Sequence, residues 1–314
     1  MRSLAGKTVL VTGGTGFIGS HLVQRLRQDK SISIVLLSRK PVPKENENIK
    51  WVNSSLDLLS SRIWERAGIK NIDVVIHLGA FTPKSTAEAD FIEDVYRDNL
   101  TGTRAMLDSL PATPERVIFS STLDVYVTPE KGESIDETSP LRPSGLYGAS
   151  KIFCEQLIRA FARTHGCGYA ILRYGHIFGP GEDAYKKLIP SMISSLLNGE
   201  PPVINGDGSA QRDYLYVEDA VEATLRAAAS DSVELGPVNI VRGSSTTIRE
   251  VAELLVKITE FDGNIKYLAD KPNGYSLRFN NSLMRKYLGE WSFVTMEDGL
   301  RREVDYFRGR FHGK

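Results

Sequence analysis

Short aliphatic runs alternate with longer amphipathic stretches along the first half of the chain. Continuous runs predict buried strands at residues 7–12, 33–37, 49–53, 73–78 and 116–120. Stretches with helical periodicity predict helices at residues 19–28 and 91–110. Strands that alternate with helices are typical of a parallel sheet with helices on both faces, and right-handed crossovers make such a sheet doubly wound. We therefore expect an α/β protein built on a doubly wound parallel sheet.

The pattern changes in the second half of the chain. A helix at 145–164 and a strand at 169–174 continue the alternation, but turn-rich segments follow from Gly179 onward. We expect residues 236–241 to return to the main sheet as a strand. Further helices are expected at 247–259 and near 296–307. The change in texture predicts a second, smaller lobe.

Composition limits the partners and the compartment. The 314 residues carry 39 basic and 39 acidic side chains, so the formal net charge is zero. A neutral chain has no electrostatic footprint for nucleic acid or an anionic membrane, and no run reaches the roughly 18 apolar residues of a membrane span. Cys154 and Cys167 form neither a disulfide framework nor a four-cysteine zinc site. We expect no nucleic acid, no membrane and no metal as partners, and a cytoplasmic location.

A glycine-rich turn follows the first predicted strand. Gly13, Gly16 and Gly19 are spaced as in the turn that binds a dinucleotide, and Phe17 and Ile18 begin the next helix. Glycine permits a tight turn, a close approach to pyrophosphate and close packing of helix against strand. The helix N-terminus then attracts the phosphates. The alternative is an ordinary turn, but the strand-turn-helix context favours a dinucleotide site of the Rossmann type.

This turn assigns roles to the two parts of the chain. Residues 1–178 plus about 211–245 form the predicted dinucleotide-binding domain. Residues of about 179–210 plus 246–314 form the predicted C-terminal α/β lobe, which we expect to hold the substrate.

The end of the second predicted strand usually distinguishes the two nicotinamide dinucleotides. An acid there accepts hydrogen bonds from the ribose 2′-hydroxyl and repels a 2′-phosphate. This chain has Ser38, Arg39 and Lys40 instead. Arg39 can bind a 2′-phosphate and stack on adenine, which favours NADP over NAD unless the two cations are only solvated surface residues. Asp57 is a candidate partner of the adenine amino group or, equally, a helix cap.

A tyrosine and a lysine four residues apart form the second chemical signal. Tyr147 and Lys151 fall on one face of the predicted helix. A free phenol, with a pKa of about 10, is a poor base at neutral pH, but a nearby ammonium and an oxidised nicotinamide stabilise the phenolate. Tyr147 can thus act as general acid or base, while Lys151 can also orient the cofactor ribose. Such a pair is usually chance, but this one follows a dinucleotide fingerprint.

A hydroxyl partner is expected at the carboxyl end of a strand, where ligands bind in open α/β sheets. Thr122 follows the predicted strand at 116–120 and is our choice for the hydroxyl that hydrogen-bonds the reacting oxygen. Ser121 is our second choice for this role. The alternative is that these hydroxyls only satisfy backbone groups at the strand end.

These motifs together resemble the extended short-chain dehydrogenases, the NAD(P)-dependent nucleotide-sugar epimerase and dehydratase family. The matching pieces run in family order over nearly the whole chain: TGGTGFIG (12–19), HLGA (77–80), DNLTGT (98–103), FSSTLDVY (119–126), YGASK (147–151), LRYGHIFGPG (172–181) and GDGSAQRDYLYVEDA (206–220). The set is specific for the family, although not for one reaction.

The resemblance implies further site residues. Leu78, Gly79 and Ala80 match the segment that passes beside the cofactor, and Asn99 matches an asparagine of the following helix. Arg212 matches an arginine that grips the nucleotide diphosphate, for which a guanidinium is well suited. The resemblance also implies a sugar carried on a nucleoside diphosphate as substrate, with hydride transfer at its C4.

Some positions depart from the family pattern. His176 stands where many relatives have an asparagine that faces the substrate, so it can contact the sugar or diphosphate or simply pack between the lobes. Arg278 lies in a segment that resembles the substrate lobe of several epimerases and reductases. Asp124 aligns with the second acid of the dehydratases, but Leu123 replaces the first. Asp124 can therefore serve in proton transfer or only cap the turn that follows it.

The reaction stays open among several alternatives. An NAD(P)-dependent epimerase or 4-ketoreductase is our first prediction, and a dehydratase or decarboxylase that uses Asp124 is the second. A non-catalytic NAD(P)-binding sensor is the alternative of another class, although such proteins commonly lack the tyrosine or the lysine.

Family relatives often dimerise through two helices per subunit. The predicted helices at 91–110 and 152–162 fit that role, because the apolar face of the latter is broader than one buried face requires.

Overall fold

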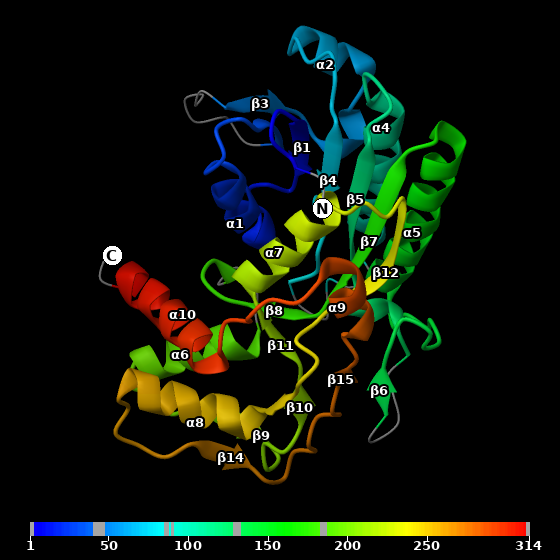
Figure 1. Cartoon of the computed structure of the whole chain (residues 1–314). Helices are drawn as coiled ribbons and strands as arrows, with labels where there is room; N and C mark the ends of the chain where they lie inside the picture. Colours follow the sequence, from blue (N-terminus) through cyan, green and yellow to red (C-terminus); the bar gives the residue numbers. More distant parts are fainter. Residues whose placement is uncertain are drawn as a thin grey trace.

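A seven-stranded parallel sheet forms the centre of the molecule (Figure 1). The computed structural model describes residues 3–39, 48–84, 88, 91–127, 133–182 and 187–311, so Lys40 lies outside the described residues. In spatial order the strands are β12 (Glu234–Ile240), β7 (Gly168–Tyr174), β5 (Arg116–Thr122), β4 (Val74–His77), β1 (Thr8–Thr12), β2 (Ser33–Ser38) and β3 (Ile49–Asn53). All neighbouring strands run parallel. The predicted doubly wound α/β sheet is confirmed.

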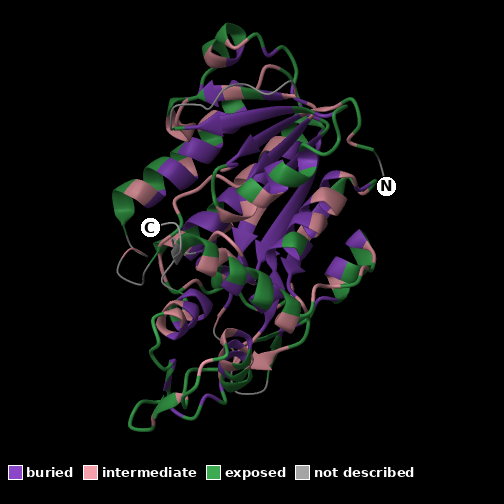
Figure 2. Ribbon diagram, turned by 90° about the vertical axis from the view of Figure 1, so that its left-hand side faces the viewer, coloured by how far each residue is buried: buried purple, intermediate pink, exposed green. Residues whose placement is uncertain are grey.

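The sheet is buried on both faces, as its continuous aliphatic runs predict (Figure 2). Along β1, Val9 and Val11 belong to the core on one face, and Leu10 belongs to the core on the other. The first face is covered by α1 (Phe17–Leu26) and α7 (Val217–Ala228). The second face is covered by α2 (Ser61–Arg66), α4 (Gly102–Ser109) and α5 (Leu146–His165).

The strand order creates a crevice at the centre of the sheet. From β1 the chain moves outward through β2 to β3 and then returns to β4 on the other side of β1. The connections after β1 and β4 therefore leave in opposite directions. Ligands bind at such a switch point, outside the carboxyl ends of the strands. The topology thus places the glycine turn after β1 beside the segment after β4.

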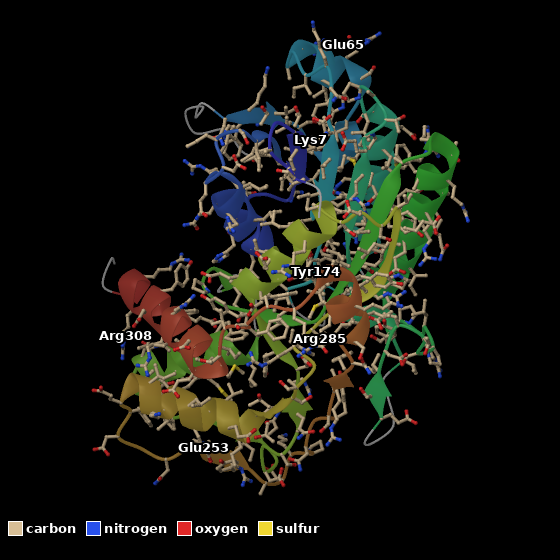
Figure 3. All side chains as sticks on the ribbon, in the orientation of Figure 1. Lys7, Glu65, Tyr174, Glu253, Arg285 and Arg308 are labelled. Atoms are coloured by element: carbon tan, nitrogen blue, oxygen red, sulfur yellow. The ribbon has the colours of Figure 1, made fainter. Side chains whose placement is uncertain are left out.

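A second group of elements covers the carboxyl ends of the strands (lower half of Figure 1). It contains short strand pairs: β8 (His176–Phe178) with β11 (Tyr214–Tyr216), β9 (Val203–Asn205) with β14 (Lys266–Leu268), and β10 (Gln211–Arg212) with β13 (Thr246–Thr247). Helices α6 (Leu188–Leu197), α8 (Ile248–Thr259) and α10 (Met296–Phe311) pack together there. In Figure 3, Tyr174 lies between the sheet and this group, while Glu253 and Arg308 lie on its outer side.

Three smaller elements complete the fold. Strand β6 (Ser134–Ile135) pairs with β15 (Arg278–Phe279), and α9 (Ser282–Leu288) packs against β12 and α7. The division of the chain into a dinucleotide-binding domain and a substrate lobe remains our proposal. In the described part of the chain, no helix combines the length and the apolar character needed to cross a membrane.

The predicted helix at 91–110 is correct in extent but not in form. It consists of α3 (Ile92–Asp94), a π-helical segment η3 (Val95–Thr101) and α4. Helices α6 and α7 were not predicted. Most residues of α6 are apolar, so its hydrophobic period is masked. Helix α7 is clearly amphipathic, so the sequence carried a signal for it that the prediction overlooked.

Candidate active site

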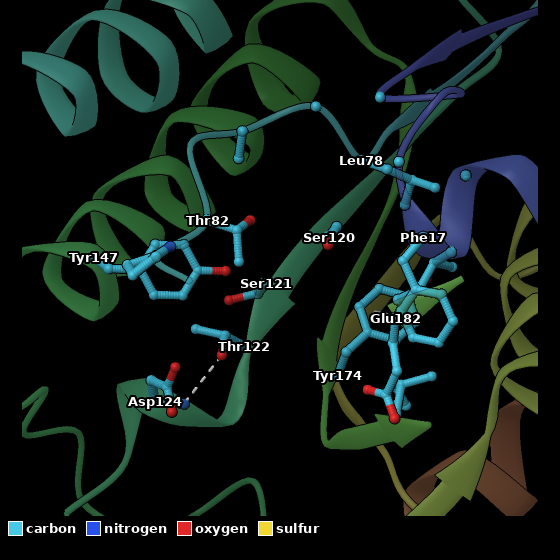
Figure 4. Close-up of a pocket in the computed structure, with 18 of the residues that line it drawn as sticks. Phe17, Leu78, Thr82, Ser120, Ser121, Thr122, Asp124, Tyr147, Tyr174 and Glu182 are labelled. Carbon is cyan, nitrogen blue, oxygen red and sulfur yellow. Dashed lines mark hydrogen bonds between the residues drawn. The ribbon is translucent and has the colours of Figure 1, made fainter. Parts of the chain in front are cut away.

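A cleft of about 750 Å³ runs along the carboxyl ends of the central strands, between the sheet and the second group of elements (Figure 4). The predicted site residues that line it are Gly13, Gly16, Phe17, Ile18, Gly19, Ser38, Arg39, Leu78, Gly79, Ala80, Thr122, Asp124, Tyr147, His176 and Arg212. Four others lie outside the lining: Asp57, Asn99, Lys151 and Arg278.

The glycine turn forms a cradle that a side chain would fill. Gly13 has a φ of +70°, and a Cβ built on it would lie 2.7 Å from the Gly79 amide nitrogen. A Cβ on Gly19 would overlap the Gly13 carbonyl oxygen. Gly16 is the N-cap of α1 and offers no side-chain cap, so the first amides of the helix face the cleft. Such a helix N-terminus is suited to pyrophosphate.

Asp57 lies outside the lining of the cleft, next to Leu56, which lines it. It sits inside the short 3₁₀ helix η1 (Leu56–Leu58), whose N-cap is Ser55, so the predicted alternative of a capping role for Asp57 is wrong. One carboxylate oxygen, Oδ1, is buried, and no hydrogen bond within the described residues reaches it. A buried acceptor without a donor fits an amino group from a ligand.

The segment after β4 is held in place by buried hydrogen bonds. His77 contacts the Thr12 hydroxyl through Nδ1 at 2.7 Å and the Thr103 hydroxyl through Nε2 at 2.9 Å. Burial, followed by the charge of Lys151, lowers the pKa of His77 to about 3, so the ring stays neutral. Thr12 also accepts the Gly79 amide at 3.0 Å. These bonds fix the strand end beside the glycine turn.

Asn99 supports the cleft from behind. Only 2% of its surface is exposed. Its Oδ1 accepts the Phe81 amide at 2.7 Å, and its Nδ2 donates to the Ser150 hydroxyl at 3.0 Å. In this geometry Asn99 joins the segment after β4 to helix α5 and does not line the cavity.

Tyr147 and Lys151 lie one turn apart near the start of α5. Tyr147 lines the cleft, and its hydroxyl points toward the end of β5 in Figure 4. Lys151 is 3% exposed, and its Nζ donates to the Ser120 carbonyl at 2.8 Å and lies 5.7 Å from the centroid of the Tyr147 ring. Burial lowers the pKa of Lys151 to about 8. The ammonium is therefore present at neutral pH and close to the phenol.

Thr122 and Asp124 lie on the same side of the cleft as Tyr147 (Figure 4). The Thr122 hydroxyl accepts the Asp124 amide at 3.2 Å and is the N-cap of the 3₁₀ turn η4 (Leu123–Val125). The cap predicted as the alternative role of Asp124 is therefore provided by Thr122. The Asp124 carboxyl faces the cleft, where burial raises its pKa while Thr122 and Lys187 oppose that rise. A carboxyl with a raised pKa is suited to proton transfer.

The far end of the cleft carries cations and a neutral imidazole. Burial, followed by the positive charges of Arg212 and Lys187, lowers the pKa of His176 to about 4. Nδ1 of His176 is buried, with no hydrogen-bond partner among the described residues. Arg212 donates to the Gln211 and Tyr275 carbonyls. Arg278 instead donates to the Gln211 side chain at 2.8 Å and stays outside the cavity.

Lys187 and Glu182 are site residues that the sequence analysis missed. Both line the cleft, and their side chains form an ion pair at 3.0 Å. Glu182 is almost fully buried, whereas Lys187 remains 43% exposed. Lys187 stands immediately before α6, a helix that the hydrophobic pattern did not reveal. Without that helix, no signal in the sequence pointed to this lysine. Among the residues that the structure describes, no cluster of His, Cys, Asp and Glu could hold a metal ion.

The comparisons with known proteins agree with this geometry. Residues 9–240 match the model of the NAD-dependent epimerase/dehydratase family. The chain belongs to this family. The predicted family is thus confirmed, and with it the prediction of an NAD(P)-dependent enzyme rather than a non-catalytic sensor.

Relatives of this family member resemble it over nearly their whole length. A protein of Methanocaldococcus jannaschii, provisionally named as a UDP-glucose 4-epimerase, is 30% identical over 96% of this chain and 98% of its own. The crystal structure of UDP-glucose 4-epimerase from Thermotoga maritima with UDP-glucose has a TM-score of 0.83 and 29% identity, covering 97% of this chain and 99% of its own. The structure of MoeE5 with UDP-glucuronic acid and NAD has a TM-score of 0.82 and 27% identity, covering 96% and 99%.

The residues of this family member fit a nicotinamide dinucleotide. The glycine cradle offers amides to a pyrophosphate, and Asp57 offers an unused acceptor at the adenosine end. Tyr147 lines the same cleft. The site therefore has the chemistry to move a proton at a sugar hydroxyl beside the place where a nicotinamide ring would lie.

Proposed function

We propose that this enzyme is a nucleotide-sugar 4-epimerase, with 4-ketoreductase as the closely related form of the same chemistry. The observation that carries the proposal is the convergence of Tyr147 and Thr122 on one cleft, with the Lys151 ammonium behind the phenol. An epimerase needs no further acid, and the position before Asp124 is Leu123. The similar proteins named above as UDP-glucose 4-epimerases support this choice.

The proton transfer belongs to Tyr147. As a phenolate, Tyr147 takes the proton of the sugar C4 hydroxyl, and Thr122 hydrogen-bonds the same oxygen. A nicotinamide dinucleotide held by the glycine cradle would supply the hydride acceptor and donor. Tyr147 then gives the proton back when the alcohol forms again on the other face. Lys151 lowers the free energy of the phenolate because its positive charge lies close to the ring.

The substrate diphosphate is proposed to lie between Lys187 and Arg212. Both cations line the cleft, and Nζ of Lys187 lies 5.6 Å from the centroid of the Phe17 ring. A guanidinium and an ammonium there offset the charge of a nucleoside diphosphate. His176 offers the unpartnered Nδ1 to a sugar or phosphate oxygen. Arg278 remains a proposed substrate residue at the rim, because it is exposed and close to Gln211.

A dehydratase or decarboxylase is the second candidate. It rests on Asp124, whose carboxyl faces the cleft next to Thr122 and has a raised pKa. Such a group can protonate a departing oxygen. The missing first acid at Leu123 places this candidate second.

The cofactor of this enzyme is NAD or NADP, and we propose that Arg39 favours NADP. Arg39 stands at the end of β2, where an acid would otherwise repel a 2′-phosphate. Its side chain is 67% exposed, so it can reach a ligand in the cleft.

We also propose a homodimer. Phe91, Ile92 and Tyr96 are exposed at the start of the α3–η3 segment, and Phe153 is exposed on α5, which packs beside η3. Large apolar side chains gathered on two neighbouring helical segments are typical of an interface. Sedimentation of the wild type and of Phe153→Asp tests this, since the variant should be monomeric.

Cys154 and Cys167 are buried free thiols, in keeping with a cytoplasmic location.

Product analysis tests the reaction. The purified protein is incubated with UDP-glucose, UDP-N-acetylglucosamine or UDP-glucuronic acid, with NAD or NADP, and the sugars are separated by chromatography. An epimerase yields the C4 epimer without net change in reduced cofactor, whereas a reductase consumes reduced cofactor stoichiometrically. Loss of water or carbon dioxide, abolished in Asp124→Asn, would replace the first candidate by the second. Binding of either cofactor without any turnover of these sugars would contradict the proposed substrate class.

A further inference from the structure

A buried carboxylate lies under Arg39 at the adenosine end of the cleft. Asp98 comes from η3 and is 8% exposed. Its Oδ2 accepts Nη1 of Arg39 at 3.2 Å, and its Oδ1 accepts Nε of Arg97 at 2.8 Å. Asp98 and Arg39 both line the cleft. The acid that is absent from the end of β2 is thus present in space, but it comes from a different element.

The π-helical form of η3 makes this placement possible. The wider turn of a π-helix brings successive side chains closer to the same side than an α-helix does, and such segments often occur at functional sites. Asp98 and Asn99 are both buried, with Asp98 toward Arg39 and Asn99 toward Phe81 and Ser150. One residue therefore faces the adenosine end while its neighbour supports the segment after β4.

The charges of Asp98 and Arg39 have opposite effects on the two dinucleotides. A 2′-phosphate carries a charge of roughly −1.5 to −2 at neutral pH. Arg39 attracts it, but Arg39 is already paired with Asp98, and the carboxylate repels any anion that joins the pair. NAD has a neutral 2′-hydroxyl at this place and meets no such repulsion. Because Asp98 is nearly buried, solvent screens this repulsion less than it would at the surface.

We propose that Asp98 is a specificity-determining residue for the cofactor, which competes for Arg39 and disfavours the 2′-phosphate of NADP. Arg39 draws the enzyme toward NADP, and Asp98 limits that preference so that NAD is also accepted. This inference rests on the proposed dinucleotide site. Asp98 would act on cofactor binding through its negative charge and its contact with Arg39.

Asp94 provides a matched control. It lies one turn earlier on the same helical segment and pairs with Arg97 at 2.7 Å, as Asp98 does, but it does not contact Arg39 or line the cleft. Asp94→Asn removes the same charge from the same arginine. It separates a general loss of negative charge from the specific contact with Arg39.

Calorimetric titration with NAD and with NADP, in the absence of substrate, tests the proposal. Dissociation constants are measured for the wild type, Asp98→Asn, Asp94→Asn and Arg39→Ala, after thermal melting confirms that each is folded. Asp98→Asn should bind NADP about tenfold more tightly, with less than a threefold change for NAD. Asp94→Asn should leave the ratio of the two constants as in the wild type.

Arg39→Ala gives a second test that needs no substitution at Asp98. With the arginine gone, Asp98 repels the 2′-phosphate directly, so NADP should bind at least tenfold more weakly than NAD. Equal binding of the two cofactors by Arg39→Ala would overturn the proposal. An unchanged cofactor ratio in a folded Asp98→Asn, or the same change in Asp94→Asn, would also overturn it. A wild-type protein that binds neither dinucleotide would instead refute the proposed cofactor site itself.

Discussion

The two ends of the cleft are built in different ways. Around the glycine turn, the walls consist mostly of backbone and small residues from two short segments, after β1 and β4. Elsewhere along the cleft, polar and charged side chains arrive from separate parts of the chain: His176 from β8, Lys187 from before α6, and Arg212 from β10. A group that is the same in every turnover, such as a pyrophosphate, can be held by main-chain amides. A substrate that differs among relatives requires side chains, whose exchange changes specificity without changing the fold.

Tyr147→Phe should have the largest effect on turnover. Tyr147 is part of neither end of the cleft. Turnover should fall by roughly 10²–10⁴-fold, because the proton of the sugar hydroxyl loses its acceptor. Cofactor affinity should stay within a few fold of the wild type. Steady-state kinetics and cofactor titration measure the two quantities. Tyr287→Phe, at an exposed position on α9, is the control and should retain full activity. Equal loss of cofactor binding and turnover in Tyr147→Phe would assign the phenol to binding instead.

Gly13→Ala should damage the cofactor end selectively. The added Cβ would lie 2.7 Å from the Gly79 amide nitrogen, so the cradle must distort and the affinity for the dinucleotide should fall by about 100-fold, near 3 kcal/mol. Gly6→Ala is a close control, since Gly6 has a φ of +72° but nothing within 4 Å of its added Cβ. Both variants carry the strain of a positive φ, so only the difference between them reports the contact. Similar cofactor affinity in the two variants would show that the close approach does not matter.

Lys187→Ala should weaken binding of the nucleotide sugar more than binding of the cofactor. The KM for the nucleotide sugar should rise by about tenfold, because one charge facing the diphosphate is lost, while cofactor affinity stays unchanged. Lys257→Ala removes an exposed lysine of α8 that pairs with Glu297, and it should leave KM unaltered. If Lys187→Ala lowers kcat at constant KM, the lysine acts on the reaction centre through Asp124 or Glu182 and the two-ended description of the cleft needs revision.

The pH dependence of Lys151 gives the smallest expected effect. The pKa of Lys151 is lowered to about 8, so kcat/KM should decline as the pH rises through 8 and the ammonium is lost. The same shift has a consequence for stability. Below pH 8 the folded protein bears the full cost of burying the ammonium, and that cost fades as the pH rises from 8 toward the ordinary pKa of 10.5.

Lys151→Met checks the sign of this effect. The variant should be inactive but should melt a few degrees higher than the wild type at pH 7, with the difference shrinking above pH 8. Melting curves at several pH values measure it. A variant that melts lower at pH 7 would show that the bond of Lys151 to the Ser120 carbonyl outweighs the cost of burial.

The amino-acid order by itself predicted the glycine turn and the placement of Tyr147 and Lys151 on one helix face. The glycine spacing depends on the backbone geometry of a few successive residues, and the spacing of Tyr147 and Lys151 depends only on the helical turn. The alternation of aliphatic runs with amphipathic stretches predicted all seven strands of the sheet, because a strand covered on both faces must be apolar throughout. These features are local, so they can be recognised without any knowledge of tertiary contacts.

Tertiary structure alone decided which distant side chains meet. Asp98 reaches Arg39 across a separation of 59 residues, and the fold turns Asn99 and Arg278 away from a cleft that Lys187 and Glu182 enter. The physical reason is that contacts between side chains far apart in the sequence depend on how the strands of the sheet and the second group of elements pack together. No periodicity along the chain reveals that packing. Charge pairs and substrate contacts between distant residues can therefore be seen only in the folded structure.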